Sequence, residues 1–356
     1  MGVLASTVRG LPPGYFALVM ATGIVSLGLK LGGFEVGSAV LLVLAALAYT
    51  VLLVLFLARL MFCWREFSAD VQNPQVSFGF FTFVAGSNVL AVRLAADGMA
   101  TPAVALAIIG LAAWLAFGYV VPWAALLGQG ERPGLQAVNG TWFIWSVASQ
   151  SVAVSAAVLD TALPQFGNIL GIVAVLSWSV GIVLYSGIAI YLSLRVIIHG
   201  IRPEDFQPQF WVAMGAMAIA VVAGSRIVGM SSTPMVDAIR TLAAGSSVVF
   251  WCFAAWLIPP LIAGGIWRHW IHRVPLRYEA GLWSIIFPLG MFAVASMSLG
   301  TADRLPIVEA VGDAWLWVAV AGWLLVAVSL AVRVVRSLRG RRASHRFVHK
   351  RANPVA

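Results

Sequence analysis

The chain has 356 residues, of which 61% are hydrophobic and only 10% are charged, and its mean hydropathy is +0.96. An ordinary soluble domain carries roughly 25% charged residues. This composition therefore excludes a soluble protein and predicts a polytopic membrane protein whose main solvent is lipid. The formal net charge of +9 comes mostly from the C-terminal tail, so it gives no information about a substrate.

Ten apolar stretches lie between charged or Pro/Gly-rich breaks. Each is about as long as the 20 or so residues that a helix needs to cross a bilayer. Helices are expected because an open strand would leave backbone amides unpaired in lipid. The sequence thus predicts an all-α polytopic membrane protein with ten transmembrane helices, at 13–31, 37–62, 75–95, 101–127, 140–159, 166–197, 208–228, 237–266, 280–300 and 308–335.

Odd-numbered and even-numbered stretches differ in length and composition. The odd ones are shorter and richer in Gly, Ser, Thr, Asn and Gln, whereas the even ones are long and rich in Leu and Val. Small and polar residues belong where helices pack closely or face water. We therefore expect five helical hairpins, with the odd helices inside, the even helices outside, and an enclosed central pathway.

The basic residues predict the topology. Of the 22 Lys and Arg, 17 fall on the side of the N-terminus, and the positive-inside rule assigns that side to the cytoplasm. We expect a cytoplasmic N-terminus (1–12), a transmembrane domain (13–335) and a basic cytoplasmic tail (336–356). The tail is expected to contact anionic lipid headgroups rather than nucleic acid.

Residue types that carry cofactor or metal chemistry are not grouped in this sequence. All five histidines lie in polar connections or in the tail, and Cys63 and Cys252 have no metal-type spacing. No glycine fingerprint of a nucleotide-binding loop follows a strand pattern. The sequence predicts no cofactor, no metal and no enzymatic activity. A membrane-embedded enzyme stays the rival interpretation, although no convergent acid, base or metal set supports it.

Ionisable residues are placed at the ends of the stretches. No Asp or Glu lies in the middle third of any of them, which disfavours cation passage and leaves neutral or anionic solutes. Lys30, Arg93 and Arg226 fall 17 or 18 residues after the starts of three odd stretches. We expect them to form a partial ring of cations at the outer mouth that attracts anions. The alternative is ordinary snorkelling of long cations at helix ends.

The third and fifth stretches carry the densest polar sets. Ser87 and Asn88 in the third, and Thr141, Ser146 and Gln150 in the fifth, are predicted to line the pathway. Hydroxyl and amide groups replace part of an anion's water shell without trapping it. Hydrogen bonding between helices is the alternative for each of them.

The ninth stretch contains Phe287 followed by Pro288. Proline frees a backbone carbonyl and bends a helix. An aromatic ring beside such a bend is suited to swing into or out of a central path as a hydrophobic gate. Packing is the alternative role for a phenylalanine in a membrane helix.

The segment 14–26 (GYFALVMATGIVS) resembles the opening signature of the tellurite-resistance/C4-dicarboxylate transporter family, and the segments 140–143 and 283–290 are similar to further family segments. That family includes plant slow-type anion channels, yeast malate permeases and fungal sulfite efflux pumps. The resemblance implies a pseudo-five-fold barrel, commonly trimeric, with a pore through each protomer. It also implies that Phe287 is the occluding aromatic before the proline.

The expected function is transport of small anions through a Phe-gated central pore of the plasma membrane. Sulfite, malate-like dicarboxylates, tellurite, and chloride or nitrate are the candidate solutes. A proton-coupled carrier of a single weak acid is the alternative within transport.

Overall fold

The computed structural model describes residues 8–127 and 134–351, with side chains as far as residue 336. Over these residues the chain is helical, with no strand. Ten of the described helices are long and apolar enough to cross a membrane. Each of their ends falls within five residues of the boundary expected from sequence. The prediction of an all-α polytopic membrane protein is confirmed.

Five spans form the inside of the bundle. Between 72% and 89% of the most apolar window of each is buried, against 11–39% for the other five spans. Each inner span opens with a short 3-10 turn and continues as an α-helix. These helices are α2 (Ala17–Leu31), α5 (Phe81–Ala95), α7 (Phe143–Leu159), α9 (Val212–Val228) and α11 (Trp283–Ala302).

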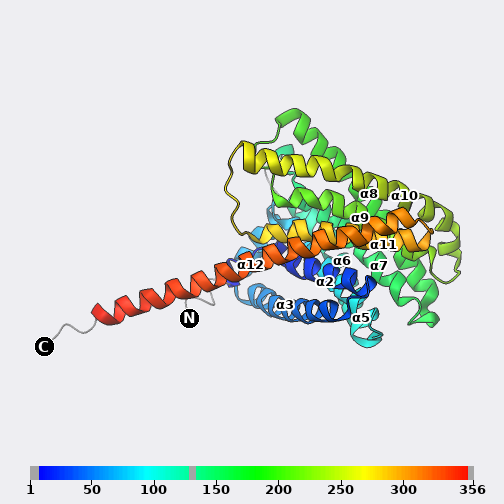
Figure 1. The fold of residues 1–356 in the computed structure, drawn as a ribbon, viewed down its shortest axis with the longest axis horizontal. Helices are drawn as coiled ribbons and strands as arrows, with labels where there is room; N and C mark the ends of the chain where they lie inside the picture. The colour runs from blue at the N-terminus through cyan, green and yellow to red at the C-terminus, as the bar shows by residue number, and fades with distance from the viewer. Residues whose placement is uncertain (1–7, 128–133, 352–356) are drawn as a thin grey trace.

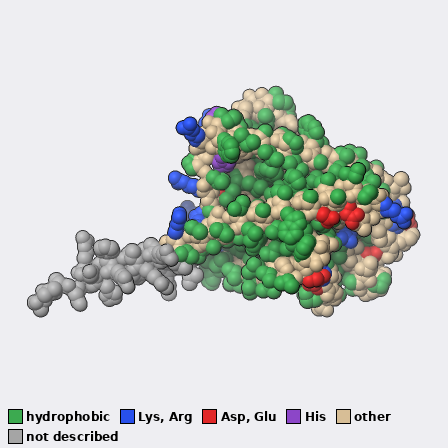
Figure 2. All heavy atoms as spheres, viewed as in Figure 1, with side chains coloured by type: hydrophobic (Ala, Val, Ile, Leu, Met, Phe, Trp, Pro, Cys, Tyr) green, Lys and Arg blue, Asp and Glu red, His purple; other side chains and the backbone are tan. Residues whose placement is uncertain are grey.

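The other five spans surround them, each packed on the inner helix that precedes it in the chain. They are α3 (Glu35–Phe62), α6 (Ala100–Pro122), α8 (Gly167–His199), α10 (Pro234–Ile266) and α12 (Pro306–Arg351). Their outward faces carry large exposed apolar side chains such as Val36, Ile108 and Val183. Hydrophobic atoms cover the middle of the molecule in Figure 2, as expected of a surface that faces lipid chains.

The inner helices contact one another in a closed ring. α2 contacts α5, and contacts then follow from α5 to α7, to α9, to α11 and back to α2. All five run in the same direction because an outer helix returns the chain after each of them (Figure 1). Equivalent positions on the five helices therefore lie at similar depths, and the ring encloses an axis.

The five 3-10 turns that open the inner spans also contact one another in a ring, which we call the collar. Its members are Pro13–Phe16, Ser77–Phe80, Gly140–Trp142, Pro208–Trp211 and Ala280–Leu282. Backbones approach closely here: a β-carbon on Gly79 would lie 2.9 Å from the backbone nitrogen of Gly14. Gly140 meets the backbone of Gln209 in the same way. The collar is thus a tight backbone-to-backbone contact.

The two ends of the bundle differ in their loops and charges. The collar end holds the long connections, including α4 (Trp64–Gln72), and α12 continues past 336 without a break to Arg351. The opposite, short-loop end holds connections of three to seven residues. Lys and Arg are seen at both ends of the molecule in Figure 2, whereas Asp and Glu lie toward one of them. The cations of the tail beyond residue 336, and Arg132, lie outside the described side chains.

Candidate functional site

A narrow cavity lies on the axis of the ring, and all five inner helices contribute to its wall. Its lining residues come in pairs three positions apart on the same helix, as a helical face requires. About 20 Å³ of it is open to the centre of a water-sized sphere, which is room for about one water molecule. We call it the axial cavity.

The axial cavity has two layers. The layer nearer the collar comprises Ile24, Asn88, Ser151, Ile219 and Met291, with Val89 beside Asn88. The layer nearer the short-loop end, called here the aliphatic layer, comprises Leu27, Val92, Val154, Val222 and Val294. A narrow passage walled by aliphatic side chains resists wetting. The aliphatic layer is therefore a hydrophobic constriction.

Asn88 has its polar atoms engaged by neighbouring groups. Its amide nitrogen donates to the carbonyl of Val84 (3.0 Å) and to Oγ of Ser151 (3.1 Å), and its amide oxygen accepts from Oγ of Ser155 (2.8 Å). Gly110 of α6 allows the side chain to fit, because a β-carbon there would lie 2.7 Å from the amide nitrogen. Asn88 reaches the axial cavity while binding α5 to α7.

The other four predicted polar residues make contacts away from the axis. Ser87 pairs with the Tyr49 hydroxyl of α3 (2.9 Å). Ser146 donates to the carbonyl of Gly181 (2.7 Å) in α8, and Gln150 donates to the carbonyl of Trp178 (3.1 Å) in the same helix. Thr141, at the collar, bonds Asn139 and the carbonyl of Gln75. Ser87, Ser146 and Gln150 are buried and Thr141 is half-buried, and the sequence did not indicate the direction in which the four side chains point.

Phe287 lies one helical turn before Met291 on α11, and Met291 and Val294 both line the axial cavity. Its ring is 1% exposed. Four positions before the matching cavity residues, the other inner helices carry Met20, Val84, Val147 and Gly215, all of them buried. Phe287 is therefore the one aromatic residue at this step on the five inner helices, on the collar side of the cavity.

Pro288 follows Phe287 within a helix that stays continuous from Trp283 to Ala302. It packs on Gly215 of α9: a β-carbon on Gly215 would lie 2.8 Å from Cγ of Pro288. This contact fixes the separation of α9 and α11 beside the Phe287 ring.

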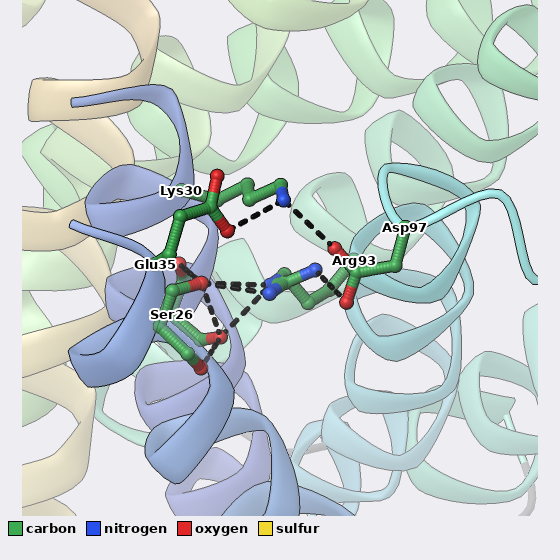
Figure 3. Close-up of polar contacts among 6 residues, drawn as sticks. Ser26, Lys30, Glu35, Arg93 and Asp97 are labelled. Atoms are coloured by element: carbon green, nitrogen blue, oxygen red, sulfur yellow. Dashed lines mark hydrogen bonds and ion pairs between the residues drawn. The ribbon is translucent and has the colours of Figure 1, made fainter. Parts of the chain in front are cut away.

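Two of the three predicted outer-mouth cations are engaged in a buried polar network (Figure 3). Arg93, 1% exposed, donates to Oγ of Ser26 (2.9 Å) and Ser38 (2.7 Å) and forms an ion pair with Asp97 at 2.8 Å. Lys30 forms ion pairs with Glu35 (2.7 Å) and Asp97 (3.2 Å).

This arrangement differs from the expected ring of three free cations. Glu35 is the first residue of α3 and Asp97 lies in the α5–α6 connection, and their carboxylates compensate the charges of Lys30 and Arg93. Arg93 and Lys30 in turn hold the pKa of the Asp97 carboxyl below its ordinary value. The network joins α2, α3 and α5 at the short-loop end.

Arg226 is in a different setting. Among the described residues it has no hydrogen-bond or ion-pair partner, and its Nε is shielded from solvent. It lines a pocket at the short-loop end, called here the Arg226 pocket, with about 310 Å³ open to water-sized spheres. The other lining residues are Leu31, Ser225, Met297, Ser298, Thr301, Ala302, Glu309 and Asp313.

The Arg226 pocket lies one helical turn beyond the aliphatic layer. Leu31 follows Leu27 by four positions, Arg226 follows Val222 by four, and Ser298 follows Val294 by four. One turn of helix rises about 5.4 Å. The axial cavity and the Arg226 pocket therefore follow one another along α2, α9 and α11.

Sequence reasoning counted Ser151 among the polar residues of the fifth stretch without selecting it, and it did not identify the aliphatic layer or the hydroxyls and carboxylates of the Arg226 pocket. The spacing of the lining residues by three positions is visible in the sequence, but many outer-helix residues share it. Over the described part of the chain, no group of three His, Cys, Asp or Glu side chains is placed to hold a metal ion.

Comparison with known proteins places this architecture in a family. The family model described as voltage-dependent anion channel (SLAC1) matches residues 10–331. An uncharacterized membrane protein of Mycobacterium tuberculosis is 48% identical over 163 residues, which are 46% of this chain and 83% of the relative. The sulfite efflux pump SSU1 of Arthroderma otae is 22% identical over 333 residues, 88% of each chain.

A further match is an uncharacterized transporter, MJ0762, of Methanocaldococcus jannaschii, which is 22% identical over 219 residues, or 61% of this chain and 62% of the relative. The family expected from the segments at 14–26, 140–143 and 283–290 is confirmed by the model match over nearly the whole chain. This multi-pass membrane protein belongs to the SLAC1 family of voltage-dependent anion channels.

Proposed function

We propose that this chain moves small anions across the membrane along the axis of the inner-helix ring. The observation that carries the proposal is a cavity walled by all five inner helices, in a member of an anion-channel family. Candidate solutes are sulfite, malate-like dicarboxylates, tellurite, chloride and nitrate. Sulfite is favoured among them by relatives that bear the name sulfite efflux pump.

In the proposed mechanism Phe287 is the gate. At the same step the neighbouring helices carry Met20, Val84, Val147 and Gly215, so Phe287 has the one ring at this level and its rotation would change the width of the axis there. Pro288 supports the role because a proline cannot donate a backbone hydrogen bond to the preceding turn. The helix there is thus held by one hydrogen bond fewer, beside the ring that must move.

The aliphatic layer would act as a second barrier in series. An anion passing it must shed water, and aliphatic walls offer no compensating hydrogen bond. The amide of Asn88 and the hydroxyl of Ser151, on the collar side, are the polar groups nearest to an ion that has crossed the layer. The aliphatic layer therefore imposes a desolvation free energy on the passing anion even when Phe287 has moved.

The proposed setting is the plasma membrane with both termini in the cytoplasm, supported by the excess of Lys and Arg at the collar end. The basic tail would contact anionic lipid headgroups. A homotrimer is proposed from the family resemblance. In this orientation the collar faces the cytoplasm and the Arg226 pocket faces outward.

The test is anion flux into liposomes that contain the purified protein, with membrane potential and pH clamped. Phe287→Ala should raise the flux of chloride, nitrate or sulfite severalfold, because the ring is removed and the surrounding structure relaxes only partly into its space. Phe292→Ala is the matched control: Phe292 is equally buried on the same helix but packs on Trp251 and Trp315, not on the axis.

Unchanged flux in a folded Phe287→Ala protein would contradict the gate. Equal gains in Phe287→Ala and Phe292→Ala would mean that general loosening, not gating, raises flux. The same assay separates a channel from a carrier, since a channel gives electrogenic current with several anions and a coupled carrier gives electroneutral uptake driven by a pH gradient.

A further inference from the structure

The Arg226 pocket has unpartnered polar atoms on two of the helices that line it, α9 and α11. Nε of Arg226, Oγ of Ser225 and Oγ of Ser298 are all shielded from solvent, and none has a hydrogen-bond partner among the described residues. Buried polar atoms are nearly always paired in folded proteins. The three residues all line one pocket, and N–H and O–H donors of this kind are satisfied by an oxyanion, since each of its oxygens accepts hydrogen bonds.

Two carboxylates complete the same pocket from α12. Glu309 and Asp313 are one turn apart and face it together. Glu309 accepts a hydrogen bond from Thr301 (3.3 Å), and neither carboxylate is within ion-pair distance of Arg226. With one guanidinium and two carboxylates, the pocket has a cationic side and an acidic side.

Other charged groups at the short-loop end are compensated elsewhere. Lys30, Glu35, Arg93 and Asp97 pair with one another on α2, α3 and α5, and Asp237 pairs with Arg240 on α10 at 2.9 Å. Asp160 accepts from the backbone of Ser231. Asp303 and Arg304 are exposed in the α11–α12 connection. The charge of the pocket is therefore determined by one basic residue, Arg226, and two acidic residues, Glu309 and Asp313.

We propose that the Arg226 pocket binds a monovalent oxyacid anion that still carries an acidic hydrogen, such as hydrogensulfite, in preference to the dianion. The anionic oxygens would accept from Arg226 and the two serines, while the remaining O–H donates to a carboxylate of α12. A dianion has no such hydrogen to give and is repelled by both carboxylates. A halide or nitrate would bind the cationic side alone.

The position of the pocket suits a role for this preference in transport, and that role rests on the proposed function. The pocket lies one turn beyond the aliphatic layer. Desolvating a monoanion costs less than desolvating a dianion. Selection of the protonated form at this point would deliver to the constriction the species that crosses it more easily.

The test measures binding without transport. The thermal unfolding midpoint of the purified protein is recorded with sulfite, handled without oxygen, at one pH below and one pH above the second ionisation of sulfurous acid. Nitrate and sulfate at constant ionic strength are the references, because their charges are the same at both pH values. We expect sulfite to stabilise the protein at the lower pH, nitrate weakly at both, and sulfate at neither.

Arg226→Gln should weaken hydrogensulfite binding about tenfold or more, as expected for loss of a charged donor. Arg304→Gln is the matched control, with the same charge change at the same end but no place in the pocket. The double variant Glu309→Gln/Asp313→Asn should lose the discrimination, so that sulfite stabilises at both pH values. Asp303→Asn controls for the lost negative charge.

Equal stabilisation by sulfite and sulfate, or hydrogensulfite binding unaffected by Arg226→Gln, would overturn the proposal. Where Arg226→Gln does not fold, Arg226→Lys keeps the charge and should lower the affinity without removing the pH preference. Binding that persists in a protein without any anion flux would instead contradict the proposed function and leave the pocket assignment standing.

Discussion

Pro288 of α11 lies directly on Gly215 of α9, with space between the two helices for a hydrogen atom but not for a methyl group. Gly215→Ala would place a β-carbon 2.8 Å from Cγ of Pro288. The helices must then move apart beside the Phe287 ring, and overpacking of this kind costs about 1–3 kcal/mol. We expect a lower unfolding midpoint together with altered anion flux.

Gly245→Ala on α10 is the control for Gly215→Ala, because no atom lies within 4 Å of the added carbon. Adding Pro288→Ala to Gly215→Ala removes Cγ and should restore part of the stability. A double variant no more stable than Gly215→Ala alone would show that the two residues do not interact as described.

The aliphatic layer predicts a polarity effect without a change in size. Val222→Thr replaces one methyl group with a hydroxyl of similar volume, which favours water in the constriction. Anion flux should rise severalfold. Val221→Thr is the matched control on the same helix, because Val221 is fully buried and does not line the axial cavity. Equal responses of the two variants would argue against a hydrophobic constriction.

Two glycines of the outer helix α8 predict different effects of substitution by alanine on the stability of the protein. A β-carbon on Gly181 would lie 2.5 Å from the amide nitrogen of Gln150, whereas one on Gly187 would meet nothing within 4 Å. Gly181→Ala should cost about 1–3 kcal/mol by displacing Gln150 from the Trp178 carbonyl. Gly187→Ala should be neutral or stabilising by up to about 1 kcal/mol. Thermal unfolding in one detergent distinguishes the two outcomes.

The Asp97 network predicts a loss of stability in acid. Its carboxyl has a pKa held below the ordinary value by Arg93 and then Lys30, so the contribution is present above the unfolded-state pKa of about 3.9. It is lost as the pH falls through the lowered pKa of the folded state. Asp97→Asn should be less stable than the wild type near pH 7, and the gap should close as the pH drops below about 4. A constant gap would contradict this linkage.

The positions of the ten spans could be predicted from sequence because the bilayer imposes a length and a hydropathy on every crossing helix. The alternation of inner and outer helices followed from composition, since small and polar residues gather where helices pack. The positions of the spans and their alternation both depend on properties summed over some twenty residues. A single residue of an unexpected type therefore does not change either prediction.

The direction of a single side chain could not be predicted in this way. Ser87 and Asn88 are neighbours, yet one pairs with Tyr49 on α3 and the other reaches the axial cavity. A step of one residue turns a helix by about 100°, and nearly every side chain of these inner helices is buried whichever way it points. Rotation is set by contacts with the neighbouring helices, which composition does not specify.

The cations illustrate a second limit. Lys30, Arg93 and Arg226 occupy matching positions in their spans, but acidic partners follow only the first two in nearby connections. Whether a basic side chain is compensated depends on loops that fold back across neighbouring helices. Asp237, the next acidic residue after Arg226, pairs instead with Arg240 three positions further along α10.

The collar constrains how the molecule can move. At two of its junctions, Gly14 with Gly79 and Gly140 with Gln209, the turns meet backbone to backbone, with a glycine at the closest approach. Main-chain atoms cannot rotate away from a contact as side chains do. Tilting all five inner helices together would therefore break the contacts between the turns of the collar. Opening by rearranged side chains in the middle of the bundle leaves those contacts intact, and the scaffold can then stay rigid through a transport cycle.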